Sequence, residues 1–244
     1  MRVHRFFIQQ SLHKGDRVEL GTETSHHIHQ VLRLRPGIEI VLFNNDGDEY
    51  AANLLQVSKK LAQAEVGESL RHEAQSRLKI HLILAISRGE RMDYAMQKAT
   101  ELGVSRITPI FSDRCVVKLD ERKRAGRLSH WQRIVINACE QSGRCRIPTI
   151  DKPLQYWNAL NTQQSASAIL LDHRSQLTLQ QIDAPETSLT LLAGPEGGLT
   201  GKERQLAIDK GFVGIRLGPR ILRTETAPLA AIAAVQTLWG DFSD

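Results

Sequence analysis

From residue 80 onward, the sequence alternates between short apolar runs and segments with helical spacing. Residues 80–87 form an apolar run typical of a buried parallel strand. The apolar residues that follow recur at helical intervals and end at a glycine that stops a helix: Met92, Ala95, Met96, Ala99 and Leu102, then Gly103. Further strands are expected at 107–111, 168–171, 189–193 and 213–217, and a second helical face at 128–139. This alternation predicts an α/β domain over residues 79–244, with a parallel sheet covered by helices.

The first 70 residues follow a different pattern, in which short alternating segments are broken by turn residues. Strands are expected at 17–20, 39–43, 50–57 and 62–66. Residues 44–48 read NNDGD and predict a hairpin turn, because Asn, Asp and Gly tolerate positive φ. Ser25 is expected to cap a single helix that ends before residue 35. These features predict a small β-domain over residues 1–70, joined to the second domain by a polar linker at 71–78.

Several classes of protein are excluded by what the sequence lacks. No apolar stretch approaches the ~18 to 20 residues that span a bilayer, and the apolar triplet at 6–8 is too short for a secretory signal. We therefore expect a cytoplasmic protein. The three cysteines form no Cys-x-x-Cys pair and are expected to be buried free thiols. His26, His27 and His29 lack acidic or cysteine partners at suitable spacing, so we expect no metal site.

The positive charge of the chain is concentrated in its middle. The formal net charge is only +5, but residues 77–146 carry 15 basic and 7 acidic residues, whereas the segments on either side are slightly acidic. Arginine outnumbers lysine in this region, which favours bidentate contacts with phosphate groups. A polyanionic partner is one interpretation. For the run at 122–127, a solvated helix face is the alternative.

Three polar or glycine-rich segments directly follow expected strands. They read DHR at 172–174, GPEGGLT at 194–200 and GPRILRTETA at 218–227. In an open α/β sheet, ligands bind outside the carboxyl ends of the strands, so these segments are candidate binding loops. Neither the Gly-x-Gly-x-x-Gly loop of dinucleotide-binding proteins nor the Lys-Ser/Thr pair of a P-loop is present. Hydride transfer with NAD and hydrolysis of nucleoside triphosphates therefore lose support.

The two longer loops carry a family resemblance. GPEGGL at 194–199 followed by LGPRILRTETA at 217–227 resembles the paired signature of the ribosomal RNA small subunit methyltransferase E family, within the SPOUT class of RNA methyltransferases. Similarity extends to SRGERM at 87–92, KATELGV at 98–104, RC at 114–115, ACEQSGR at 138–144 and VLR at 31–33. The resemblance covers most of the chain, and the second signature is long enough to be specific.

The resemblance implies a fold and a reaction that spacing alone does not. Family members have an N-terminal PUA-like β-barrel that binds RNA and a C-terminal SPOUT α/β domain with a deep trefoil knot, an exception to the rule against knots. They are homodimers, and they use S-adenosylmethionine (SAM) to methylate N3 of one uridine, U1498, in 16S rRNA of the small ribosomal subunit. The same fold, cofactor, substrate and assembly are expected here.

Methyl transfer from a sulfonium is an in-line displacement, so positioning of donor and acceptor dominates the rate. The expected cofactor residues lie in the three loops: Leu171, Ala193, Gly194, Gly198, Leu217, Gly218, Leu222 and Thr224. Because uridine N3 must lose its proton, a cation or a general base is required. Arg223 is the candidate cation, and Glu225, together with Glu196, is the candidate base. The alternative for Glu225 is a structural role, favoured by a helix dipole or paired with an arginine.

The expected RNA contacts come from the basic middle of the chain and from the N-terminal domain: Arg33, Arg88, Arg114, Lys118 and Arg144. The nearly all-round apolar helix expected at 228–239 is predicted to meet a second subunit in part. Two other functions stay open. One is an RNA-binding assembly factor without catalysis, and the other is a SPOUT enzyme that acts on tRNA or on ribose. Cofactor binding and the identity of the methylated product distinguish them.

Overall fold

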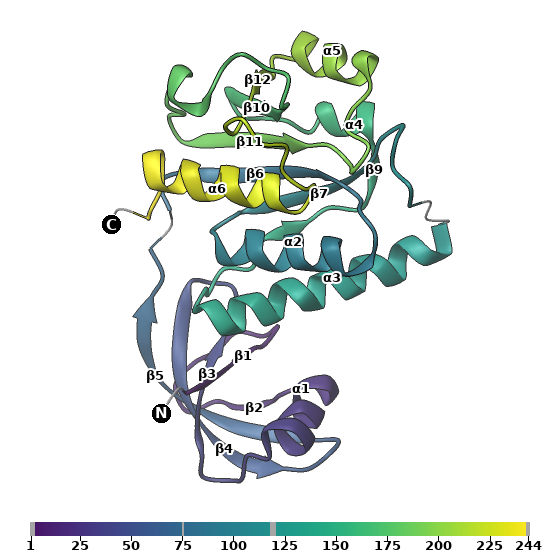
Figure 1. Cartoon of the computed structure of the whole chain (residues 1–244). Coiled ribbons are helices and arrows are strands. Elements are labelled where there is room, and N and C mark those ends of the chain that lie inside the picture. Colours follow the sequence, from purple (N-terminus) through teal and green to yellow (C-terminus); the bar gives the residue numbers. More distant parts are fainter. Residues whose placement is uncertain (1–2, 75, 118–120, 243–244) are drawn as a thin grey trace. The chain divides into compact units, whose positions relative to one another are not determined.

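The computed structural model describes residues 3–74, 76–117 and 121–242, and of residues 121–123 it describes the backbone alone. The chain forms two compact units. The first comprises Met1–Gln75 together with Cys139–Ile147, and the second comprises Ser76–Ala138 and Pro148–Asp244. Figure 1 shows the course of the chain through both units. Residues 139–147, which the sequence places within the second domain, therefore pack with the first unit.

The first unit is built on a five-stranded sheet with the order β1-β3-β4-β5-β2. Its strands are β1 (His4–Phe7), β2 (Arg17–Glu19), β3 (Glu39–Phe43), β4 (Asp48–Val57) and β5 (Ala62–His72). The hairpin expected at 44–48 joins β3 to β4, which pair antiparallel, and Asn45 and Gly47 there have positive φ. Alternate residues of the strands form a buried apolar core around Leu42 and Leu54. β5 continues to residue 72, into the segment expected to be a linker, because it pairs with β4 as far as Asp48.

The helical segment of this unit differs from the expected one. α1 (Thr22–His26) is followed directly by a π-helical turn, η1 (His27–Leu32), and Arg33 ends it with φ 51°, in the left-handed region. The prediction that Ser25 caps the helix is wrong, since Gly21 occupies that position. Ser25 is 1% exposed. Its hydroxyl donates to the carbonyl of Leu20 and accepts from the amide of Ala62, so it joins the helix to the sheet.

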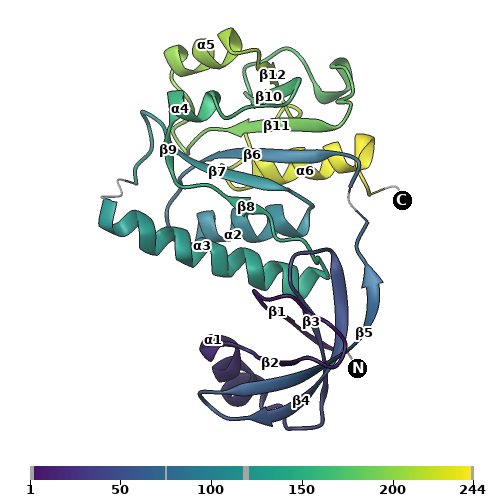
Figure 2. The same ribbon diagram turned by 180° about the vertical axis from the view of Figure 1, so that it is seen from behind.

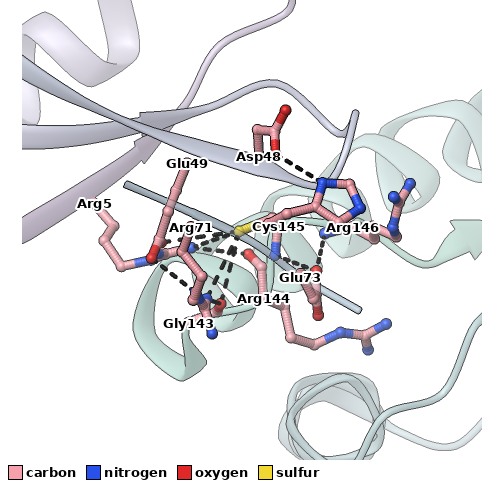
Figure 3. Close-up of polar contacts among 10 residues, drawn as sticks. Arg5, Asp48, Glu49, Arg71, Glu73, Gly143, Arg144, Cys145 and Arg146 are labelled. Atoms are coloured by element: carbon pink, nitrogen blue, oxygen red, sulfur yellow. Dashed lines mark hydrogen bonds and ion pairs between the residues drawn. The ribbon is translucent and has the colours of Figure 1, made fainter. Parts of the chain in front are cut away.

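Residues 139–147 are held in the first unit by a network of charged side chains (Figure 3). The Glu73 carboxylate accepts from the amides of Cys145 (2.6 Å) and Arg146 (2.9 Å). The Arg71 guanidinium donates to the carbonyl of Gly143 at 2.7 Å and also pairs with Glu49. Glu49 in addition forms an ion pair with Arg5. Every side chain in this network lies far from the segment in sequence, so the packing of 139–147 depends on non-local contacts.

The same contacts enclose two of the three cysteines. Cys139 and Cys145 are buried beside Phe43, as predicted, whereas Cys115 of the second unit is partly exposed. Burial raises the pKa of the Cys139 thiol to about 12. Glu140 accepts from the amide of Phe7 at 3.1 Å, and its burial raises the pKa of its carboxyl to about 7, despite that hydrogen bond and the nearby Arg5 charge.

The second unit contains a seven-stranded sheet. The strands are β6 (Lys79–Ala85), β7 (Arg106–Phe111), β8 (Thr149–Ile150), β9 (Leu154–Gln155), β10 (Ser167–Leu171), β11 (Ser188–Ala193) and β12 (Val213–Ile215). The order is β12-β10-β11-β6-β7-β8, with β9 also paired to β7, and every pairing is parallel. The predicted parallel sheet is confirmed. The two-residue strands β8 and β9 were not predicted, because they are too short to show a periodicity.

Helices cover both faces of this sheet. They are α2 (Gly89–Glu101), α3 (Glu121–Ser142), α4 (Tyr156–Leu160), α5 (Gly201–Asp209) and α6 (Thr226–Trp239), and a short 3-10 turn, η2, spans Leu179–Gln181. α6 lies in front of β6 in Figure 1 and behind it in the opposite view of Figure 2, and it packs against α2. On the other face, α4 and α5 contribute Tyr156 and Ala207 to a core shared with Ile83 and Leu192. Burial on both faces explains the continuous apolar runs of β6 and β11.

A buried polar network lies at the amino ends of β6 and β7. His81 is 8% exposed, and its Nε2 lies 2.7 Å from the Thr108 hydroxyl, which in turn donates to Asp151. Arg106 donates to the same carboxylate at 2.8 Å. Burial, reinforced by the Arg106 charge, lowers the pKa of His81 to about 4. The imidazole is therefore neutral at physiological pH.

Candidate active site

Three loops meet where neighbouring strands of the second unit end. β11, β10 and β12 are adjacent and parallel, so the segments that follow them leave the same edge of the sheet. A cavity of about 510 Å³ lies among these segments. Small-molecule sites usually measure about 300–1,000 Å³. The fold therefore creates a ligand-sized cavity at the carboxyl edge of the sheet, where open α/β sheets bind ligands.

The cavity brings together most of the residues expected to hold the cofactor. Seven of the eight line it: Leu171, Ala193, Gly194, Gly198, Leu217, Leu222 and Thr224. Gly218 does not line it, but its φ of +75° forms the turn at the start of the third loop. The loops also contact one another directly, since the Thr224 hydroxyl donates to the carbonyl of Gly194 at 2.8 Å.

Glycines in the second loop leave the cavity open and allow the chain to turn tightly. A Cβ atom at Gly194 would lie 3.0 Å from Cγ of Leu199, too close for ordinary packing. Gly198 has φ +65°, which favours glycine, and its amide donates to the carbonyl of Pro195 at 2.8 Å. Three glycines of this loop, Gly194, Gly197 and Gly198, line the cavity, so this part of its wall is backbone without side chains.

All three residues expected to act in the chemistry also line the cavity. One carboxylate oxygen of Glu225 is buried and has no hydrogen-bond partner among the described residues. Arg223 is exposed. Glu196 lies 3.5 Å from the Arg91 guanidinium, and both residues line the cavity. A buried carboxylate oxygen without a donor is unfavourable unless a ligand supplies one, so Glu225 is the clearest candidate for a direct contact with a ligand.

One ion pair in the cavity wall was not predicted from the sequence. Arg204, in the first turn of α5, donates to Asp172 of the first loop at 3.1 Å. Both side chains are largely buried, and both residues line the cavity. An arginine near a helix amino terminus opposes the helix dipole, and this unfavourable placement was the available signal. Together with Glu225 and Arg223, the pair gives the cavity both signs of charge.

The expected RNA contacts are spread over both units. Arg33, at the end of η1, and Arg88, directly before α2, are exposed. Arg144 is half-buried in the segment held by Glu73, and its carbonyl accepts from Arg5. Arg114 lies beside the cavity rather than away from it, with its guanidinium on the carbonyl of Gly197. Lys118 lies outside the described residues.

No group of three or more His, Cys, Asp or Glu side chains in the described ranges is placed to hold a metal ion. Within the same ranges, no helix combines the length and apolar character needed to cross a bilayer.

Family models match both parts of the chain. An RNA methyltransferase domain matches residues 74–236, and an RNA methyltransferase PUA domain matches residues 20–67. Whole-length relatives are also found. The ribosomal RNA small subunit methyltransferase E of Buchnera aphidicola (subspecies Acyrthosiphon pisum) is 34% identical over 99% of this chain and 96% of its own length. That of Bacillus subtilis is 31% identical over 96% of each.

Two solved structures resemble the whole fold. A ribosomal RNA small subunit methyltransferase E from Neisseria gonorrhoeae, bound to S-adenosyl methionine, is 42% identical, with a TM-score of 0.92 over 99% of this chain and all of the other. A Legionella pneumophila protein solved in complex with SAM is 37% identical, with a TM-score of 0.96 over the same shares. Both likenesses extend over the two units described above.

Proposed function

Because the chain belongs to the ribosomal RNA small subunit methyltransferase E family, we propose that it transfers a methyl group from SAM to N3 of one uridine, U1498, in the 16S rRNA of the small ribosomal subunit. Membership confirms the resemblance drawn from the loops at 194–199 and 217–227. The names of the relatives support an rRNA substrate. The choice of N3 and of this uridine is the part of the proposal that rests on the loop signatures alone.

The cavity at the carboxyl edge of the second unit is the proposed cofactor site. The two similar structures that hold SAM support this choice. The residues present also fit such a ligand, because glycines without side chains line part of the cavity and charged groups of both signs line the rest. Bound SAM supplies an electrophilic methyl group on a positively charged sulfur. Leu171, Ala193, Leu217, Leu222 and Thr224 form the remaining proposed contacts, with Gly218 shaping the third loop.

The proposed chemistry depends on Glu225 and Arg223. The observation that carries it is the buried Glu225 oxygen without a hydrogen-bond donor at the cavity wall. Glu225 lines the cavity and has a carboxylate oxygen without a donor among the described residues, so Glu225 is assigned as the acceptor of the proton that must leave before N3 attacks. Arg223 stabilises the negative charge that then develops on the uracil oxygens. Glu196, which pairs with Arg91 and also lines the cavity, is a second proton acceptor.

Binding of RNA is proposed for the exposed arginines of both units. Arg33 lies in the unit that contains the PUA match, and Arg88 precedes α2 of the methyltransferase unit. Arg144 and Lys118 belong to the same proposal. If these cations contact phosphates, the affinity for small subunits falls steeply with salt. The target uridine must also leave its stack to reach the cavity.

The trefoil knot, the β-barrel form of the first unit and a homodimer complete the proposal. The dimer is supported by α6, whose residues are mostly apolar and which leaves Leu238 48% exposed. A ribosomal substrate supports a cytoplasmic location. Sedimentation at micromolar concentration tests the dimer: a species of twice 27.4 kDa supports it, and a 27.4 kDa monomer alone contradicts it.

The chemistry is tested with two variants that keep side-chain size. Glu225→Gln removes the proton acceptor and is expected to lower kcat by about 100-fold or more, the usual size of a general-base effect, with little change in the Kd for SAM. Glu186→Gln, at an exposed position that does not line the cavity, is the matched control. Wild-type turnover of Glu225→Gln at saturating SAM and small subunits removes this residue from the chemistry. Arg223→Met is measured in the same way.

A further inference from the structure

Arg114 contacts the glycine loop that borders the cavity. Its Nη1 donates to the carbonyl of Gly197 at 2.9 Å. Gly197 itself lines the cavity, between Glu196 and Gly198. The hydrogen bond therefore fixes a backbone group of the loop proposed to hold SAM.

The aliphatic stem of Arg114 packs on the same glycine. A Cβ atom at position 197 would lie 3.2 Å from Cβ of Arg114, closer than ordinary van der Waals contact, and 3.5 Å from its Cδ. The stem thus lies along the face of Gly197 where a side chain would otherwise project. Arg114 therefore makes both a hydrogen bond and a packing contact with Gly197. Both contacts join the turn after β7 to the loop after β11.

The neighbouring residue Asp113 makes a second link between these two segments. Its amide donates to Oε1 of Glu203 at 2.8 Å. The other carboxylate oxygen of Glu203 accepts from the amide (2.8 Å) and the hydroxyl (3.0 Å) of Thr200, the N-cap of α5. Glu203 is only 6% exposed, so its charge is compensated by these three donors. The loop at 194–200 is held from the β7 side both at its middle and at its end.

The loop needs this support because it is rich in glycine. Gly194, Gly197 and Gly198 lose more conformational entropy on ordering than other residues would. The internal hydrogen bond from Gly198 to Pro195 closes one turn, and Thr224 contacts only the first residue of the loop. At Gly197, the contact that holds the backbone comes from Arg114.

We propose that Arg114 is a positioning residue for the cofactor site: through the carbonyl of Gly197 it holds the glycine loop in the conformation that binds SAM. This inference rests on the proposed function of the cavity, and it replaces an RNA contact as the main role of this arginine. A cation at this position orders the loop before the methyl donor arrives, so its loss weakens SAM binding without changing the contacts with RNA.

The test measures the Kd for SAM by titration calorimetry, without RNA, in the wild type, Arg114→Met and Arg114→Lys. Methionine keeps most of the stem and removes the donors. We expect it to raise the Kd by about five- to tenfold, the effect of one net hydrogen bond. Lysine keeps one donor and is expected to recover part of the loss. Arg127→Met, an exposed arginine of α3, is the matched control and is expected to keep the wild-type Kd.

A second readout separates positioning from RNA binding. The KM for small subunits is measured against salt concentration for the same variants at saturating SAM. We expect the salt dependence of Arg114→Met to equal that of the wild type. A phosphate contact would instead reduce the slope by about 1 and leave the Kd for SAM unchanged, and this outcome would overturn the inference. Thermal unfolding of each variant verifies that it is folded.

Failure of the inference is distinguishable from failure of the proposed function. If the wild type does not bind SAM, the proposed function of the cavity is wrong. If the wild type binds SAM and Arg114→Met binds it equally well, the cofactor site stands and the positioning role of Arg114 is wrong.

Discussion

Glu140 makes the stability of the first unit depend on pH in an unusual direction. Burial raises the pKa of its carboxyl from 4.5 to about 7, and this effect exceeds the opposing effects of the Phe7 amide and the Arg5 charge. The folded unit therefore holds the proton more tightly than the unfolded chain does. The resulting stability is fully present below pH 4.5 and is lost as the pH rises through about 7.

The size of the effect follows from the pKa difference. A rise from 4.5 to about 7 corresponds to on the order of 3 kcal/mol. Glu140→Gln keeps an oxygen that can accept from the Phe7 amide but carries no charge at any pH. At pH 8 this variant is expected to be more stable than the wild type by about 1–3 kcal/mol, and the difference should shrink as the pH falls toward 4.5.

The assay must report on the first unit alone. All three tryptophans lie in the second unit: Trp131, Trp157 and Trp239. Tryptophan fluorescence therefore reports on unfolding of the second unit and not of the first. Hydrogen exchange of peptides that cover β1 and β3, compared between variant and wild type at each pH, reports on the correct one. Glu186→Gln is the control. A difference in protection that stays constant between pH 5 and pH 8 would refute the reasoning about Glu140.

Three other substitutions test the fold. Ser25→Ala removes the buried hydroxyl that bonds to Leu20 and Ala62 and should cost about 1–3 kcal/mol by hydrogen exchange of β5; unchanged protection would contradict its bridging role. Arg33→Gly relieves a left-handed residue and should stabilise the first unit by about 1 kcal/mol, whereas a loss would show that side-chain contacts outweigh strain. For His81, stability is complete above pH 6.5 and is lost as the pH falls toward about 4. Urea unfolding followed by tryptophan fluorescence should show this loss, weakened in His81→Asn; an equal loss in both proteins would exclude His81 as its source.

Local sequence patterns predicted most of the second unit. The apolar runs of β6 and β11 and the helical spacing in α2 identified a parallel α/β sheet, because strands buried on both faces and helices buried on one leave different periodicities. The strand β1 of the first unit was not predicted. β1 has four residues and pairs in parallel with β3, a partner distant in sequence. This pairing with a distant segment defines the strand, and the local pattern of residues 4–7 did not predict it.

Non-local contacts account for the other differences between the structure and the predictions from the sequence. Residues 139–147 continue α3 but belong to the first unit, since Glu73 and Arg71 bind their backbone. In the site, the rule that ligands bind at the carboxyl ends of strands predicted the loops, and seven of the eight residues expected to hold the cofactor line the cavity. The pairing of Arg204 with Asp172 and the contact of Arg114 with Gly197 depend on side-chain geometry. The expectation that Arg114 contacts RNA rested on its place in the basic middle of the chain, near the end of a strand.

The most direct test of the central claim is transfer of radiolabelled methyl from SAM to small ribosomal subunits that lack their native modification, followed by digestion to nucleosides. We predict labelled 3-methyluridine in 16S rRNA, with the initial rate of labelling lowered by about 100-fold or more when Glu225→Gln replaces the wild type. Label on ribose, on tRNA or on another base would contradict the proposed substrate, and SAM binding without any transfer would favour an RNA-binding assembly factor instead.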